Sequence, residues 1–133
     1  EEPASLLKTV NPNSQIRENG SIRVFSSRRH ATDQLQHLCN RLEEKMAPVQ
    51  RFPIGSALKL AYLAAGKGDI YARFGNVSEW DVAAGHAILR CVGGDLLSLQ
   101  YEAIQYGRKP TMIVPGFLAV AYIDFDWRPI LLT

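Results

Sequence analysis

Five residues of types that bind phosphate or a divalent cation occur along this chain: His30, Ser56, Lys59, Arg73 and Asp81. Ser56 opens a predicted helix, where free backbone N–H groups attract anions, and Lys59 lies one turn later on the same face. Arg73 ends a predicted strand, and its planar guanidinium suits phosphate. His30 follows two arginines at another strand end, where it is placed to contact a phosphate or a base. Each of these four also has an ordinary interpretation, as a helix cap, a solvent-reaching lysine, a surface salt bridge or a surface histidine.

Asp81 lies in the first turn of a helix predicted around Trp80, with Ser78 as a good N-cap and Gly93-Gly94 as the stop. Two interpretations of Asp81 remain open. Its carboxylate either completes the cap and complements the helix dipole, or is aimed across the helix N-terminus at a cation.

The same helix carries apolar residues at helical spacing, which predicts one continuous buried stripe. Small residues in this stripe let another backbone approach closely. The stripe consists of Trp80, Ala83, Ala84, Ala87, Ile88 and Cys91.

Strand and helix patterns alternate three times, which favours an α/β layer with a mostly parallel sheet covered by helices on both faces. Helices are predicted from 32 or 33 to just before Pro48, over 57–65 (apolar almost all round and therefore buried) and around Trp80. Strands are predicted over 21–26, 49–54 (where Pro53 implies a strand end or a sheet edge), 69–74 and 95–99. The segments 112–114 and 117–122 are predicted to form either strands or a strand, a turn and a helix. Residues 1–20 read as irregular, 101–109 as a loop, and the tail is ambiguous. Ligands in such sheets bind beyond the carboxyl ends of the strands, where the five polar residues fall.

The composition is that of an ordinary globular domain: 133 residues, 47% apolar, with a net charge of +2. No basic run or stripe predicts binding to a nucleic-acid polymer, and no apolar stretch has the length of a membrane span. Cys39 and Cys91 each lie on a predicted apolar helix face and have no metal-binding spacing. They are predicted to be free buried thiols in a reducing compartment, the cytoplasm.

The segment Trp80-Asp81-Val82-Ala83-Ala84-Gly85, closed by Gly93-Gly94, resembles the C-terminal motif of the inositol monophosphatase family of metal-dependent phosphatases. The segments 55–59 and 71–75 lie upstream in the order and at the spacing of that family. The resemblance covers roughly residues 26 to 119.

Within the family the chain is most similar to the 3′(2′),5′-bisphosphate nucleotidases of the CysQ type. Ser27-Arg28-Arg29-His30 resembles a stretch that precedes the first helix in that branch. Pro115-Gly116-Phe117-Leu118-Ala119 resembles the closing strand of the family, although Val114 stands where an asparagine is usual.

The resemblance implies a three-layer αβα fold with a mostly parallel or mixed sheet, equal to the C-terminal half of an αβαβα sandwich. It implies that Asp81 is a Mg²⁺ ligand, that Ser56, Lys59 and Arg73 hold the phosphates of the substrate, and that His30 lies near its sugar or base. The implied reaction is hydrolysis of the 3′-phosphate of 3′-phosphoadenosine 5′-phosphate by a metal-activated water. An inositol monophosphatase-type domain is the alternative.

The other metal ligands of the family come from an N-terminal half with an Asp-Pro-Leu/Ile-Asp-Gly-Thr segment, which does not occur here. Residues 1–133 are therefore predicted to be a single C-terminal domain with an irregular lead-in over 1–20, inactive by itself. The surface that packs on the missing half is expected to be apolar and to favour self-association. A non-catalytic anion-binding module of the same fold remains open, as does a peripheral association with the inner membrane.

Overall fold

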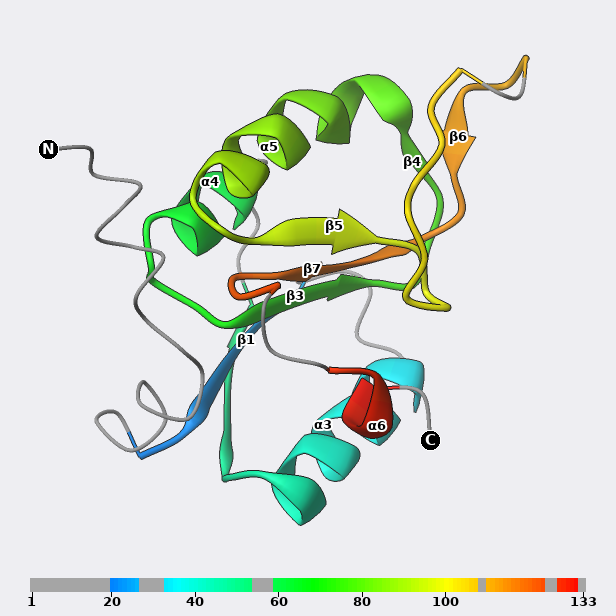
Figure 1. The fold of residues 1–133 in the computed structure, drawn as a ribbon. Helices are drawn as coiled ribbons and strands as arrows, with labels where there is room; N and C mark the ends of the chain where they lie inside the picture. Colours follow the sequence, from blue (N-terminus) through cyan, green and yellow to red (C-terminus); the bar gives the residue numbers. More distant parts are fainter. Residues whose placement is uncertain (1–19, 27–32, 54–58, 108–109, 124–126, 132–133) are drawn as a thin grey trace, which may run out of the picture.

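The computed structural model describes residues 20–26, 33–53, 59–107, 110–123 and 127–131. Within these ranges a five-stranded sheet forms the centre of the molecule, in the order β2-β1-β3-β7-β5 (Figure 1). Strands β1, β2 and β3 are parallel, whereas β7 runs antiparallel to both β3 and β5. The strands are β1 (Ile22–Ser26), β2 (Val49–Pro53), β3 (Ile70–Arg73), β5 (Asp95–Leu97) and β7 (Phe117–Val120).

Helices cover both faces of this sheet, so the predicted three-layer α/β fold with a mixed sheet is confirmed (Figure 1). One face carries α4 (Lys59–Ala64) and α5 (Glu79–Cys91), and the other carries α3 (Asp33–Lys45) and α6 (Arg128–Leu131). A second, two-stranded ladder of β4 (Val77–Ser78) and β6 (Ile113–Val114) lies beside the start of α5. None of the helices in the described ranges combines the length and apolar character needed to cross a membrane.

Helix α3 buries the residues that its sequence pattern predicts. Asp33 in its first turn and Lys45 in its last turn complement the helix dipole. Strand β2 is the outermost strand on one side, as its terminal Pro53 predicts. The buried side chains of α3 are Leu35, Leu38, Cys39 and Leu42.

Helix α5 presents a different face to the core from the one predicted. Val82, His86 and Leu89 are its buried residues, whereas Trp80 is 77% exposed and Ile88 is 51% exposed. The prediction of a buried stripe was wrong because α5 carries apolar residues on two faces, and the sheet together with α4 covers only one of them. The residues of the predicted stripe that face solvent are Trp80, Ala83, Ala84, Ala87, Ile88 and Cys91.

The two cysteines differ in their exposure to solvent. Cys39 is buried, and burial raises the pKa of its thiol, whereas Cys91 is exposed, against prediction. Helix α4 is also less enclosed than predicted, since Ala61 and Tyr62 are exposed while Leu60 faces the core.

The tail, ambiguous in sequence, contributes Trp127 to the core. Its side chain is 0% exposed, and its indole N–H donates to the carbonyl oxygen of Tyr122 at 2.8 Å. Most of the predicted irregular lead-in, residues 1–19, lies outside the described residues.

Candidate functional site

Three parallel strands end at one edge of the sheet. The register places Ser26, the last residue of β1, opposite Pro53, the last residue of β2, and places Phe25 opposite Tyr71 of β3. Arg73, the last residue of β3, therefore lies at the same edge, on the side of the molecule where α5 begins (Figure 1). This is the edge at which the sequence predicts a ligand.

Two of the predicted site residues, His30 and Ser56, lie outside the described residues. Their roles remain predictions. The structure describes the other three, Lys59, Arg73 and Asp81.

Lys59 is the first residue of α4 and is only 7% exposed, so it does not reach solvent as a surface lysine does. Its ammonium nitrogen lies 5.1 Å from the centroid of the Tyr71 ring, within the range of a cation–π contact. Burial lowers the pKa of Lys59, and the charge of Arg73 lowers it further. The interior thus disfavours the charged form of this lysine.

Arg73 is half-buried and lies in the same neighbourhood. Its Nη2 donates to the carbonyl oxygen of Asn76 at 3.1 Å, while its buried Nε finds no hydrogen-bond acceptor within the described parts of the chain. Burial raises the pKa of Tyr71, and a hydrogen bond with Arg73 and the charge of Arg73 oppose that rise. We call Lys59, Tyr71 and Arg73 the basic cluster: two cations beside one aromatic ring.

Asp81 lies in the first turn of α5, and its side chain is exposed. The predicted N-cap is confirmed, because the Ser78 hydroxyl accepts from the backbone N–H of Trp80 at 3.2 Å. Ser78 therefore caps the helix with its own side chain, and the Asp81 carboxylate faces solvent.

A magnesium ion needs several oxygen ligands, and the described residues do not gather them. No group of three or more His, Cys, Asp or Glu side chains within the described ranges is placed to hold a metal ion. Asp81 alone leaves water in the remaining positions of an octahedral ion. The described part of this chain thus fits one ligand of a magnesium site and not a complete site.

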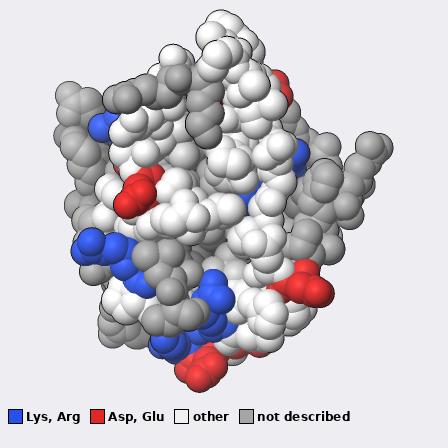
Figure 2. All heavy atoms as spheres, turned by 90° about the vertical axis from the view of Figure 1, so that its right-hand side faces the viewer, with Lys and Arg blue, Asp and Glu red and all other residues white. Residues whose placement is uncertain are grey.

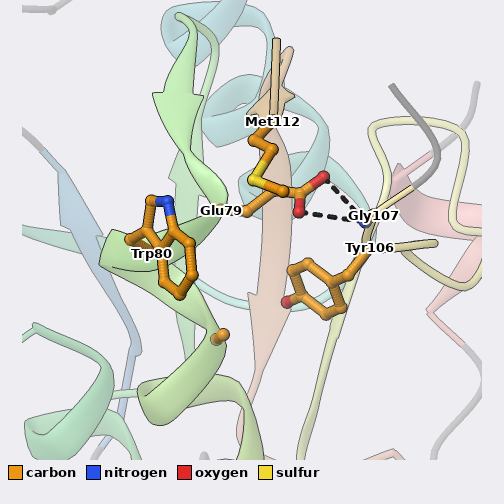
Figure 3. Close-up of a pocket in the computed structure, with 6 residues that line it drawn as sticks. Glu79, Trp80, Tyr106, Gly107 and Met112 are labelled. Carbon is orange, nitrogen blue, oxygen red and sulfur yellow. Dashed lines mark hydrogen bonds between the residues drawn. The ribbon is translucent and has the colours of Figure 1, made fainter. Parts of the chain in front are cut away.

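A cavity of about 310 Å³ lies beside the first turn of α5 (Figure 3). The Glu79 carboxylate accepts from the backbone N–H of Gly107 at its rim, at 3.0 and 3.2 Å. Of the sequence-predicted site residues that the structure describes, Lys59, Arg73 and Asp81, none lines this cavity. Its walls come from two segments far apart in sequence, so no periodic pattern could reveal it. The lining residues are Glu79, Trp80, Ala83, Tyr106, Gly107 and Met112.

The side of the molecule that carries this edge is divided by charge (Figure 2). Its upper half, which belongs to the layer of α4 and α5, is mostly uncharged, and most of its Lys and Arg side chains lie in the lower half, with Asp and Glu side chains beside them. Exposed Trp80, Met112 and Ile113 contribute apolar surface to the α5 layer.

The chain is similar to known proteins over most of its length. The model of the inositol monophosphatase family matches residues 4–122. The 3′(2′),5′-bisphosphate nucleotidase CysQ of Salmonella typhimurium is 35% identical over 108 residues, which cover 81% of this chain and 42% of that protein. An uncharacterized protein of Rhizobium leguminosarum is 48% identical over 75 residues, 56% of this chain and 79% of that protein.

The crystal structure of CysQ from Bacteroides thetaiotaomicron superposes with a TM-score of 0.64 and 33% identity, covering 74% of this chain and 36% of that one. The chain thus spans less than half the length of the CysQ proteins that it matches. With its mixed sheet between two helical layers and a family match over nearly its whole length, the chain belongs to the inositol monophosphatase family.

Proposed function

We propose that this chain is the phosphate-binding half of a magnesium-dependent phosphatase that removes the 3′-phosphate of 3′-phosphoadenosine 5′-phosphate. The proposal draws its reaction class from the 35% identity to CysQ of Salmonella typhimurium. The observation that carries it is the basic cluster. Burial lowers the pKa of Lys59, and repulsion by the charge of Arg73 lowers it further.

An anion between these cations removes that repulsion. A phosphate accepts hydrogen bonds from both the ammonium and the guanidinium, and it gives the buried Nε of Arg73 an acceptor. Charged hydrogen bonds of this kind contribute roughly 1.5–3 kcal/mol each. The cost of placing Lys59 in the interior is then offset by substrate binding.

The residues of the chain have separate tasks in this proposal. Ser56, Lys59 and Arg73 hold the phosphates of the substrate, and His30 lies near its sugar or base. Asp81 supplies one oxygen ligand at the start of α5. Bound magnesium neutralises phosphate oxygens and lowers the pKa of a water ligand.

The remaining metal ligands come from a second half of the same protein in this proposal. Two observations support such a half: the chain matches only 42% of the Salmonella typhimurium CysQ, and the described residues hold no group of three metal-binding side chains. The second half would pack on the exposed apolar face of α5, which includes Trp80 and Ile88.

Phosphate release from 3′-phosphoadenosine 5′-phosphate tests the proposal. We expect Mg²⁺-dependent turnover by a protein that carries both halves and none by the 133-residue chain. Lys59→Met should raise KM by roughly tenfold to a hundredfold, the loss of one charged hydrogen bond, and the exposed Lys67→Met should leave it within twofold. If the two substitutions raise KM equally, the basic cluster does not bind the substrate.

A non-catalytic anion-binding module is the second candidate, favoured by the lack of a metal-binding group among the described residues. This candidate predicts that the 133-residue chain and the protein with both halves bind the bisphosphate equally, and that Lys59→Met weakens binding equally in both. It also predicts that neither protein releases phosphate. Turnover by the protein with both halves excludes it.

A further inference from the structure

His86 lies on the buried face of α5, between Val82 and Leu89, and is 9% exposed. Its Nε2 lies 2.7 Å from Oδ1 of Asp95, and its Nδ1 lies 2.7 Å from the hydroxyl oxygen of Tyr106. An ionised carboxylate only accepts, so the hydrogen-bond network assigns the proton of a neutral imidazole to Nε2. Nδ1 then accepts from the Tyr106 hydroxyl.

The phenol keeps the proton that this hydrogen bond requires. Burial raises the pKa of Tyr106 to about 12, with further contributions from the charges of Glu79 and Asp95. Tyr106 therefore remains a donor at neutral pH, and its hydroxyl links the loop that precedes β6 to the middle of α5.

The same loop is attached to α5 at a second place (Figure 3). The Glu79 carboxylate accepts from the N–H of Gly107 with both oxygens, at 3.0 and 3.2 Å. Gly107 has a φ of 72°, in the left-handed region that favours glycine, so the backbone turns its N–H at low cost. Glu79 and His86 are two helical turns apart on one face, and they bind adjacent loop residues.

The far end of the loop also meets the first turn of α5. The backbone N–H of Glu79 donates to the carbonyl oxygen of Met112 at 2.9 Å, and Ser78 pairs with Ile113 between β4 and β6. The first turn, on which Asp81 lies, is thus held through Glu79, whose backbone N–H binds Met112 and whose carboxylate binds Gly107, while Tyr106 binds α5 at His86.

We propose that His86 and Tyr106 are positioning residues: their hydrogen bond fixes the loop at 106–107 against α5, and Glu79 transmits this constraint to the helix turn that carries Asp81. The part that concerns Asp81 rests on the proposed function. Neither His86 nor Tyr106 belongs to the basic cluster, so neither is expected to contact the substrate phosphates.

Tyr106→Phe tests this proposal because it removes one hydroxyl and keeps the ring. In the 133-residue variant we expect the amide hydrogen of Gly107 to exchange about fivefold faster than in the parent, because one net hydrogen bond is lost. The exchange rate of the Val120 amide in β7 should not change. Tyr62→Phe, at an exposed tyrosine of α4, is the matched control. Circular dichroism and melting establish that each variant is folded. Unchanged Gly107 exchange in Tyr106→Phe overturns the proposal.

Kinetics of the protein with both halves test the consequence for the site. We expect Tyr106→Phe to lower kcat about fivefold with KM for the bisphosphate unchanged, because the basic cluster is intact. Gln at position 79 keeps a carbonyl oxygen for Gly107, so Glu79→Gln should retain more of kcat than Glu79→Ala. If Tyr106→Phe speeds Gly107 exchange but leaves kcat unchanged, His86 and Tyr106 do not position Asp81. If the parent enzyme has no activity, the proposed function fails, and Gly107 exchange, which needs no substrate, decides the loop attachment by itself.

Discussion

Leu60 of α4 lies directly over Gly85 of α5: a Cβ atom placed on Gly85 would come within 2.6 Å of Leu60 Cδ1 and 2.8 Å of Leu60 Cβ. The two helices approach closely here because one of them has no side chain at this position. This contact fixes the layer that presents both Lys59 and Asp81.

We therefore expect Gly85→Ala to lower the free energy of unfolding by roughly 1–3 kcal/mol, although alanine has the better helix propensity by about 1 kcal/mol. Thermal and urea unfolding measure the change. A Cβ on Gly75 would meet nothing within 4 Å, so Gly75→Ala is the control and should be neutral or slightly stabilising. A Gly85→Ala variant as stable as the parent would contradict the close approach.

Lys59→Met should stabilise the chain in the absence of an anion, by roughly 0.5–2 kcal/mol, since it removes a charge that burial and the nearby charge of Arg73 both disfavour. The pKa of Lys59 is lowered in the folded chain, so folding disfavours its protonated form. Protonated Lys59 therefore lowers the free energy of unfolding by its full amount at pH values below its pKa in the folded chain, and by nothing above its unfolded pKa of 10.5. The stability gained by Lys59→Met should accordingly shrink as the pH approaches and passes 10.5. Urea unfolding between pH 7 and pH 11 measures it. A constant gain over this range would contradict the electrostatic explanation.

Arg73→Glu should change the substrate preference of a protein with both halves. The guanidinium only donates, so it favours a second phosphate, whereas a carboxylate accepts from the hydroxyls of a polyol. We expect the parent to prefer 3′-phosphoadenosine 5′-phosphate over inositol 1-phosphate by at least tenfold to a hundredfold in kcat/KM, from roughly 1.5–3 kcal/mol. The variant should narrow or reverse this ratio, mainly through loss of the bisphosphate. An unchanged ratio would favour the inositol phosphatase alternative.

Asp81→Asn separates the two roles of this carboxylate. Ser78 provides the cap hydrogen bond, so Asp81→Asn should leave the melting temperature nearly unchanged, while Ser78→Ala should cost about 1 kcal/mol. If Asp81 is a metal ligand, its loss removes several kcal/mol of transition-state stabilisation, so activity of the protein with both halves should fall roughly a hundredfold or more. Melting and initial rates on the same samples distinguish the roles. A lower melting temperature with proportionate residual activity would support capping.

The exposed apolar face of α5 should make the isolated chain self-associate. Trp80→Ser and Ile88→Ser replace the two most exposed large apolar residues of α5 and should shift the chain towards the monomer in sedimentation velocity at high concentration. Ile123→Ser changes a similarly large apolar residue, 38% exposed, outside α5, and it should leave the association unchanged. A parent chain that stays monomeric at every concentration would contradict this prediction.

Much of the fold follows from local signals. Some structural signals act within a few residues, so they can be recognised in the sequence without the rest of the molecule. They include the strand residues of 21–26, the apolar spacing from Leu35 to Leu42 in α3 and the Ser78 cap. The motif around Trp80 and Asp81 likewise identifies the family, because its residues are contiguous.

The buried face of α5 was decided by tertiary structure. Hydrophobic spacing identifies apolar residues, but α5 is apolar on two faces, and only the contact with α4 and the sheet selects Val82, His86 and Leu89. Burying an imidazole there is unfavourable unless its nitrogens are hydrogen-bonded, and the partners of His86 are Asp95 and Tyr106, brought to it by β5 and a loop. The sequence by itself determined the longer helices, the strands of the main sheet, the Ser78 cap and the family, but not β4 or α6. Three features depend on contacts between distant segments, which only the folded chain provides. They are the choice of the buried face of α5, the lowering of the pKa of Lys59 by burial and by Arg73, and the cavity beside Glu79.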